Sequence, residues 1–278
     1  MQENDAPVYP NNDLLSIALE AAFSAGEAIM KIYNTDFDIK YKRDLSPLTL
    51  ADTTADKIIH KYLAATGIPV ISEESASEDY TRRQFWKMLW MVDPLDGTKE
   101  FVRRSDEFTV NIALILEQKP VLGVVYAPAT GVLYFGMSSL GSFYTRIDLL
   151  EDKPVLSAAD IIAGSKKLPL FSDKKQFVIQ ASRSQMNAET KKFIEKQKKL
   201  HPQLHIVTQG SSLKLCAVAD GSCQVYPRFG PTMEWDTAAG HAIIEQTGGK
   251  VVEAKKGIPL SYNKNSLLNP DFLAISRS

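Results

Sequence analysis

The chain has 278 residues, of which 44% are hydrophobic and 23% are charged, and its formal net charge is −1. This composition is typical of a globular protein built as one large domain or two fused lobes. A net charge near zero excludes a general attraction to nucleic acid or anionic membranes, so local groups or bound cations would have to attract an anionic substrate.

Targeting and redox signals are absent from the pattern of residues. The polar segment 1–13 lacks the basic-then-apolar order of a signal peptide, and no apolar run approaches the roughly 20 residues of a membrane helix. Cys216 and Cys223 lie in apolar segments, which favours reduced, buried thiols. We therefore expect a soluble, intracellular protein with no membrane span.

The first half of the chain predicts an α+β lobe. Apolar residues recur at helical spacing through residues 12–33, with Asn12 or Asp13 available as the N-cap, and a second helix is expected over residues 50–66. Three apolar runs joined by turns between residues 108 and 144 predict an antiparallel meander. Shorter strands are expected at residues 37–42, 68–72 and 85–92.

The second half predicts an α/β lobe. Residues 148–170 read as an irregular connector, so we expect one lobe over residues 1–150 and a second over residues 151–278. Strands and helices then alternate, which is typical of an α/β arrangement. The expected elements are residues 176–182, 187–200, 204–209, 211–221, 223–227 and 235–248.

Several acidic residues lie in unusual places. Glu73 and Glu74 directly follow a buried strand, Asp93 and Asp96 follow another, and Asp236 opens an apolar helix. Carboxylates at strand ends and at a helix start converge on a cleft, where they repel one another unless a cation is present. Hard oxygen ligands suit Mg²⁺ rather than zinc, and no histidine or cysteine cluster competes with them.

The turn that holds Asp93 and Asp96 has further features of a metal and phosphate site. Pro94 restricts the backbone so that both carboxylates and the Leu95 carbonyl can face one centre. Gly97 lets the backbone approach a ligand closely. For this motif alone, an ordinary capped turn remains the alternative.

Two residues could align a water molecule. Asp52 lies at the start of the second predicted helix, and Thr98 follows the acidic turn and could begin another short helix. A simple capping role is the alternative for each residue.

Three separated motifs resemble the inositol monophosphatase-like superfamily of Mg²⁺-dependent, Li⁺-sensitive phosphatases: SEES (72–75), DPLDGT (93–98) and EWDTAAG (234–240). The resemblance covers nearly the whole chain and implies a five-layered α-β-α-β-α sandwich with two lobes. Within the superfamily, residues 93–115 and 210–241 look most like the 3′(2′),5′-bisphosphate nucleotidase branch. Inositol phosphatases more often have Thr-Asn-Phe where this chain has residues 98–101.

The resemblance implies a set of roles. Glu73, Asp93 and the Leu95 carbonyl would hold a first Mg²⁺, Asp93, Asp96 and Asp236 a second, and a weaker third ion could lie near Glu73. A metal-activated water, aligned by Thr98 and Asp52, would attack the phosphate in line. The implied catalytic residues are Asp52, Glu73 and Thr98; the implied substrate contacts are Glu73, Leu95, Asp96, Gly97, Thr98, Ser182, Gly210, Lys214, Arg228 and Asp236.

The contacts expected from the second lobe each have an alternative interpretation. For Arg228 a surface salt bridge is the alternative, and Lys214 could be a lysine at the edge of the core. Gln185 stands where relatives often have histidine, so base contacts there depart from the family pattern.

The activity implied is hydrolysis of 3′-phosphoadenosine 5′-phosphate (PAP) to AMP and phosphate, and also of its phosphosulfate analogue, in sulfur assimilation and PAP detoxification. The alternatives are an inositol or sugar phosphatase of the same superfamily and a non-catalytic nucleotide-binding relative. We expect a small nucleotide as partner, no nucleic acid, and a cytoplasmic location, with attachment to the inner membrane left open. The sequence does not distinguish a monomer from a homodimer.

Overall fold

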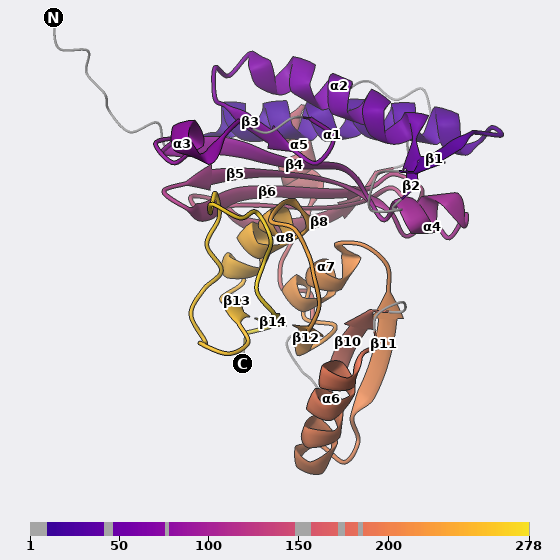
Figure 1. The fold of residues 1–278 in the computed structure, drawn as a ribbon, viewed down its shortest axis with the longest axis vertical. Coiled ribbons are helices and arrows are strands. Elements are labelled where there is room, and N and C mark those ends of the chain that lie inside the picture. Colours follow the sequence, from indigo (N-terminus) through magenta and orange to yellow (C-terminus); the bar gives the residue numbers. More distant parts are fainter. Residues whose placement is uncertain are drawn as a thin grey trace, which may run out of the picture.

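The computed structural model describes residues 10–41, 47–75, 78–147, 157–171, 176–182 and 186–277. Two helices, α1 (Asn12–Tyr33) and α2 (Leu50–Ala64), pack against each other and cover one face of a seven-stranded sheet (Figure 1). A short ribbon of β1 (Ile39–Tyr41) and β2 (Pro47–Thr49) connects them. Among the described helices, none combines the length and apolarity needed to cross a bilayer.

The large sheet has the strand order β3-β4-β5-β6-β7-β8-β9. Strands β3 and β4 pair in parallel, and every later pair is antiparallel, which confirms the predicted meander. The strands are β3 (Val70–Ser72), β4 (Met88–Asp96), β5 (Thr109–Leu116), β6 (Lys119–Ala127), β7 (Val132–Met137), β8 (Gly141–Arg146) and β9 (Lys166–Lys167).

Helices α7 (Leu213–Ala219) and α8 (Trp235–Glu245) form the middle layer. Helix α8 packs on the large sheet from β4 to β8, and α7 packs on a second, five-stranded sheet of order β11-β10-β12-β14-β13. Helix α6 (Ala188–Leu200) lies on the other face of that sheet, where Ile194 contacts the buried Ile179 and Val225. These strands are β10 (Val178–Ser182), β11 (His205–Gln209), β12 (Val225–Arg228), β13 (Lys250–Glu253) and β14 (Phe272–Ile275).

The layers therefore follow the order α-β-α-β-α, as Figure 1 shows from α1 and α2 down to α6. This arrangement confirms the five-layered fold expected from the resemblance. It also places α8, from the second half of the chain, directly on the sheet formed by the first half.

Strand β4 separates two apolar cores. Trp90 and Val92 pack in the core beneath α1 and α2, whereas Leu89 and Met91 pack in the core beneath α8, as the period of two along a strand requires. Leu95 breaks the alternation, because it packs with the core of α1 and α2. A register shift against β5 occurs between Asp93 and Asp96.

Helix starts differ from the expectations in detail. Asn11, still extended with φ −132° and ψ 174°, is the N-cap of α1 and accepts from the Leu14 N–H, so the predicted caps Asn12 and Asp13 are wrong by one or two residues. Thr49, not Asp52, is the N-cap of α2.

The predicted irregular connector over residues 148–170 is partly regular. Its described part contains α5 (Ala158–Gly164), which starts at a capping box of Ser157 and Asp160, and β9. The lobe boundary at residues 150 and 151 lies outside the described residues and stays a prediction. The remaining short helices are α3 (Tyr80–Arg83) and α4 (Thr98–Val102). Cys216 and Cys223 are buried, as expected.

Candidate active site

Three carboxylates from three elements meet between the large sheet and α8. Glu73 follows β3 and donates its backbone N–H to the Val92 carbonyl at 3.2 Å, which holds it beside β4. Asp93 lies on β4, and Asp236 lies in the first turn of α8. One oxygen from each of Glu73, Asp93 and Asp236 lies within 4.8 Å of the others, a group that could hold a metal ion.

The electrostatics of this group favour a bound cation. Asp93 is 1% exposed, and burial together with the charges of Glu73, Asp96 and Asp236 raises its pKa well above the usual range. Burial and the Asp96 charge raise the pKa of Asp236 to about 8. A bound cation would compensate the buried negative charge and so oppose both causes of the raised pKa values, burial and the neighbouring carboxylates.

Backbone donors hold the carboxylates in place. The Leu95 N–H donates to Asp93 at 3.1 Å, and the Met233 N–H donates to Asp236 at 2.8 Å. Each of these two acids therefore has one oxygen that accepts from a backbone N–H two or three residues away in the chain.

Asp96, at the end of β4, lies outside the three-residue group but next to it. Its Oδ2 accepts from the Ser212 hydroxyl at 2.8 Å and from the Asn111 amide at 3.4 Å. Gly97 then turns the chain with φ +91°, a conformation that L-residues rarely adopt.

Asp52 and Thr98 lie together, as the sequence pattern suggested. The Thr98 hydroxyl lies 3.0 Å from Asp52 Oδ1 and 3.2 Å from the Leu95 carbonyl oxygen. Asp52 Oδ2 accepts from both the backbone N–H and the hydroxyl of Thr49 at 2.7 Å. Asp52 therefore stabilises the start of α2 with one oxygen and contacts Thr98 with the other.

The pKa of Asp52 is raised by burial, and hydrogen bonds from Thr49 and Thr98 oppose that effect. In the carboxylate form Asp52 accepts the single Thr98 proton, which leaves the lone pairs of the Thr98 oxygen available to a water molecule. The pair can thus orient a water beside the carboxylate group.

A cavity of about 170 Å³ adjoins Asp96 and Asp236 and brings most of the remaining predicted residues together. Lys214 is buried, which lowers its pKa to about 8, and its ammonium group lies 5.7 Å from the centre of the Tyr226 ring. Arg228 donates to the Pro231 carbonyl at 2.8 Å, and its buried Nε has no hydrogen-bond partner among the described residues. The predicted residues that line the cavity are Asp96, Gly97, Ser182, Gly210, Lys214, Arg228 and Asp236.

Some residues of the site were not predicted. Ser212 and Asn111 hold Asp96, and Gln209 and Tyr226 line the cavity. The serine precedes α7 in a run of two serines, and nothing in the local pattern distinguishes which one faces a carboxylate. Gln185 lies outside the described residues.

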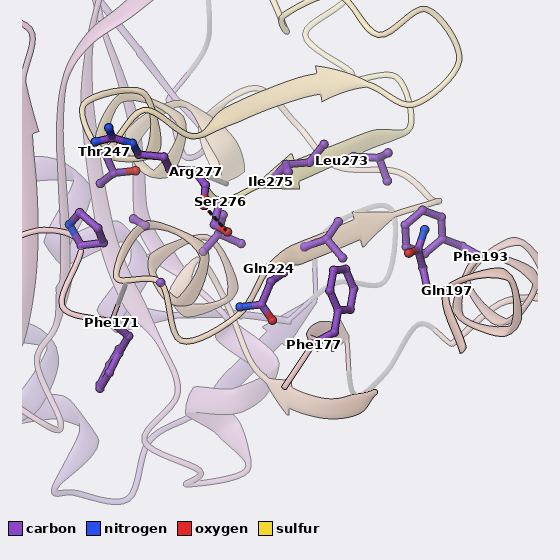
Figure 2. A pocket seen from close by; sticks show the side chains of 15 residues that line it. Phe171, Phe177, Phe193, Gln197, Gln224, Thr247, Leu273, Ile275, Ser276 and Arg277 are labelled. Atoms are coloured by element: carbon purple, nitrogen blue, oxygen red, sulfur yellow. Dashed lines mark hydrogen bonds between the residues drawn. The ribbon is translucent and has the colours of Figure 1, made fainter. Parts of the chain in front are cut away.

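A larger cavity lies elsewhere. It has a volume of about 520 Å³ and is lined mainly by apolar side chains, including Phe177, Phe193, Leu273 and Ile275, which Figure 2 shows around Gln224. None of the predicted site residues lines it. The chemistry of the lining, rather than the volume, therefore identifies the candidate active site.

Comparison with known proteins agrees with this geometry. The sequence model of the inositol monophosphatase family matches residues 11–275. The chain belongs to the inositol monophosphatase family. This membership confirms the resemblance read from the three sequence motifs.

Within this family, the chain is similar to proteins named 3′(2′),5′-bisphosphate nucleotidase CysQ. The one from Shigella flexneri is 43% identical over 264 residues, covering 93% of this chain and 98% of that protein. The one from Escherichia coli strain K12 is 42% identical over the same length and coverage. The crystal structure of CysQ from Bacteroides thetaiotaomicron superposes with a TM-score of 0.88 at 44% identity, covering 96% of this chain and 98% of that one.

Proposed function

We propose that this protein is a Mg²⁺-dependent 3′(2′),5′-bisphosphate nucleotidase that hydrolyses the 3′-phosphate of PAP to give AMP and phosphate. The observation that carries the proposal is the cluster of three carboxylates, Glu73, Asp93 and Asp236, next to a cavity lined by Lys214 and Arg228. Negative ligands for cations and positive groups for a second phosphate are the pair that a bisphosphate substrate requires. Similarity to proteins named as such nucleotidases supports the same conclusion.

The residues present fit magnesium. All donors in the group are oxygens, and burial together with the charges of Glu73, Asp96 and Asp236 raises the pKa of Asp93, an environment in which a cation would be stabilised. Glu73, Asp93 and the Leu95 carbonyl would hold one ion, and Asp93, Asp96 and Asp236 a second. Bound ions would supply positive charge for the phosphate oxygens and would make water more acidic at neutral pH.

The side chains of the protein have separate tasks in this proposal. The Thr98 hydroxyl donates to Asp52, and its oxygen accepts a hydrogen bond from the water, which orients the water. Lys214 and Arg228 bind the phosphate that is not cleaved, and the glycine at position 97 lets the nucleotide approach the backbone. Ser182 and Gly210 line the same cavity and would contact the nucleoside.

A substrate comparison tests the proposal. Phosphate release from PAP, its 5′-phosphosulfate analogue and inositol 1-phosphate should be measured side by side with Mg²⁺ and with EDTA. We expect turnover of PAP that requires the metal. Preference for the inositol ester by about an order of magnitude would identify an inositol phosphatase, and nucleotide binding without turnover would identify a non-catalytic relative.

A further inference from the structure

A directed chain of hydrogen bonds ends on Asp96. The Thr109 hydroxyl donates to the Asn111 side-chain oxygen at 2.9 Å, and the Asn111 amide donates to the Ser212 hydroxyl oxygen at 2.9 Å. The Ser212 hydroxyl then donates to Asp96 Oδ2 at 2.8 Å. Thr109, Asn111 and Ser212 are each at most 3% exposed, so water does not replace these bonds readily.

Ser212 connects three elements that meet at the site. It directly precedes α7, it donates to Asp96 at the end of β4, and its oxygen also lies 3.0 Å from the Asp236 carbonyl at the start of α8. A hydroxyl has one proton, and the charged carboxylate at the shorter distance is the stronger acceptor. The Asn111 amide occupies a lone pair of the same oxygen, which sets the direction of the chain.

The loop before Ser212 packs closely against the first half of the chain. The Gly210 N–H donates to Glu107 at 2.9 Å, and a Cβ at Gly210 would lie 2.9 Å from the Glu107 carbonyl oxygen. Ser211 has φ +42°, a strained value for a residue with a side chain. A Cβ at Gly97 would lie 3.2 Å from the Ser211 Cβ. The loop is thus seated closely on the turn that carries Asp96.

We propose that Ser212 is a positioning residue that couples occupancy of the nucleotide cavity to the metal-binding geometry of Asp96. The loop that bears it also carries Gly210, and α7 behind it carries Lys214, both of which line the cavity. A nucleotide bound against this loop restricts the position of the Ser212 hydroxyl. Through its hydrogen bond, the hydroxyl then restricts the position of the Asp96 carboxylate. This inference rests on the proposed function, which assigns Asp96 to a cation and the cavity to a nucleotide.

Calorimetric titration of Mg²⁺ with and without a nucleotide measures the coupling directly. The probe is 3′-deoxyadenosine 5′-phosphate, which lacks the 3′-oxygen and the 3′-phosphate that would contact a metal at the reacting position. We expect this nucleotide to raise the Mg²⁺ affinity of the wild-type protein by about tenfold. In Ser212→Ala the enhancement should fall below about twofold, because the chain of hydrogen bonds is interrupted.

Two variants separate positioning from a loss of stability. Ser142→Ala removes another buried hydroxyl, which donates to the Ile243 carbonyl at 2.7 Å away from the site, and should keep the tenfold enhancement. Ser212→Thr keeps the donor and should restore a large part of the coupling that the alanine variant lacks. Melting temperatures of all three variants in EDTA report their stability independently of metal binding.

The outcomes are distinct from those of the substrate comparison. A Ser212→Ala protein that retains the wild-type enhancement, or a wild-type protein with none, overturns the coupling even if PAP is hydrolysed. A wild-type protein that does not hydrolyse PAP overturns the proposed function even if the enhancement is observed.

Discussion

Replacing Asp236 by asparagine should stabilise the metal-free protein while abolishing its activity. Asparagine has nearly the same shape, and its side-chain oxygen can still accept from the Met233 N–H, as the carboxylate does at 2.8 Å. The substitution removes one negative charge from the group formed with Glu73 and Asp93. The structural interactions of the residue are kept, and only its charge is lost.

The distance between the carboxylates sets the size of the expected stabilisation. Carboxylate oxygens of this group lie within 4.8 Å of one another. Two unit charges at that separation repel by about 3.5 kcal/mol at an effective dielectric constant of 20. Above pH 8, where Asp236 is ionised, the substitution relieves close to one such repulsion, and we expect a gain of about 2–4 kcal/mol in the free energy of unfolding.

The gain should depend on pH in a defined direction. The folded-state pKa of Asp236 is about 8, above its ordinary value of 3.8, so ionisation opposes folding. The contribution of this group to wild-type stability is fully present below about pH 4 and is lost as the pH rises through about 8. Asparagine does not titrate, so the variant should match the wild type near pH 4 and exceed it most above pH 8.

Urea unfolding in EDTA at pH 4.5 and pH 8.5 measures this difference, and the same experiment with Mg²⁺ should remove or reverse it. Asp271→Asn is a matched control, since Asp271 also accepts one backbone N–H, from Gly230 at 3.0 Å, but lies outside the carboxylate group. If the Asp236 variant is no more stable than the wild type at pH 8.5 without metal, the reasoning from repulsion is wrong.

Three further substitutions test the other parts of the site. Thr98→Ala should lower kcat by about 10²- to 10⁴-fold with little change in KM, because the hydroxyl that donates to Asp52 orients the water. Thr98→Ser keeps the hydroxyl and should retain activity, and steady-state assays with PAP check both variants. Asp96→Asn should abolish turnover, because it removes a carboxylate proposed to hold a cation. The circular dichroism spectrum should stay unchanged, because the substitution also removes a charge that raises the pKa of Asp93. Near-normal turnover would refute the assignment of Asp96 to a metal. Lys214 has a pKa of about 8, so KM for PAP should rise as the pH increases from 7 to 9, and in Lys214→Arg that rise should be absent because arginine stays charged; a parallel rise in both proteins would contradict the assignment.

The placement of Glu73, Asp93 and Asp236 was predictable because each follows a strong local signal. Two buried strands and an apolar helix end or begin at these residues, and such ends converge between layers. The meander was equally visible, since each of its strands is bounded by turn residues. Where apolar periodicity is strong, the order of the layers follows.

Residues whose roles depend on contacts distant in the chain were not predictable. Ser212 is 116 residues from Asp96, which accepts its hydrogen bond, and Asn111 is 101 residues from Ser212. For Asp52 the local pattern allowed a cap or a water-aligning group, and the structure shows that the two oxygens of one carboxylate serve different partners. Helix α5 was missed because its seven residues are too few for a clear apolar period.

The register shift in β4 has a consequence for the atoms that the backbone presents. Asp93 pairs with Asn111 and Asp96 with Thr109, so the two residues between the aspartates have no partner in the ladder. A regular strand could also bring two acids to one face, at a spacing of two, but its ladder would engage the carbonyl between them. The first of the two unpaired residues is a proline, which has no N–H to leave unsatisfied. The second is Leu95, whose carbonyl accepts from the Thr98 hydroxyl at 3.2 Å. In the proposed site, the extra residue thus leaves a main-chain oxygen that a bound ion could use.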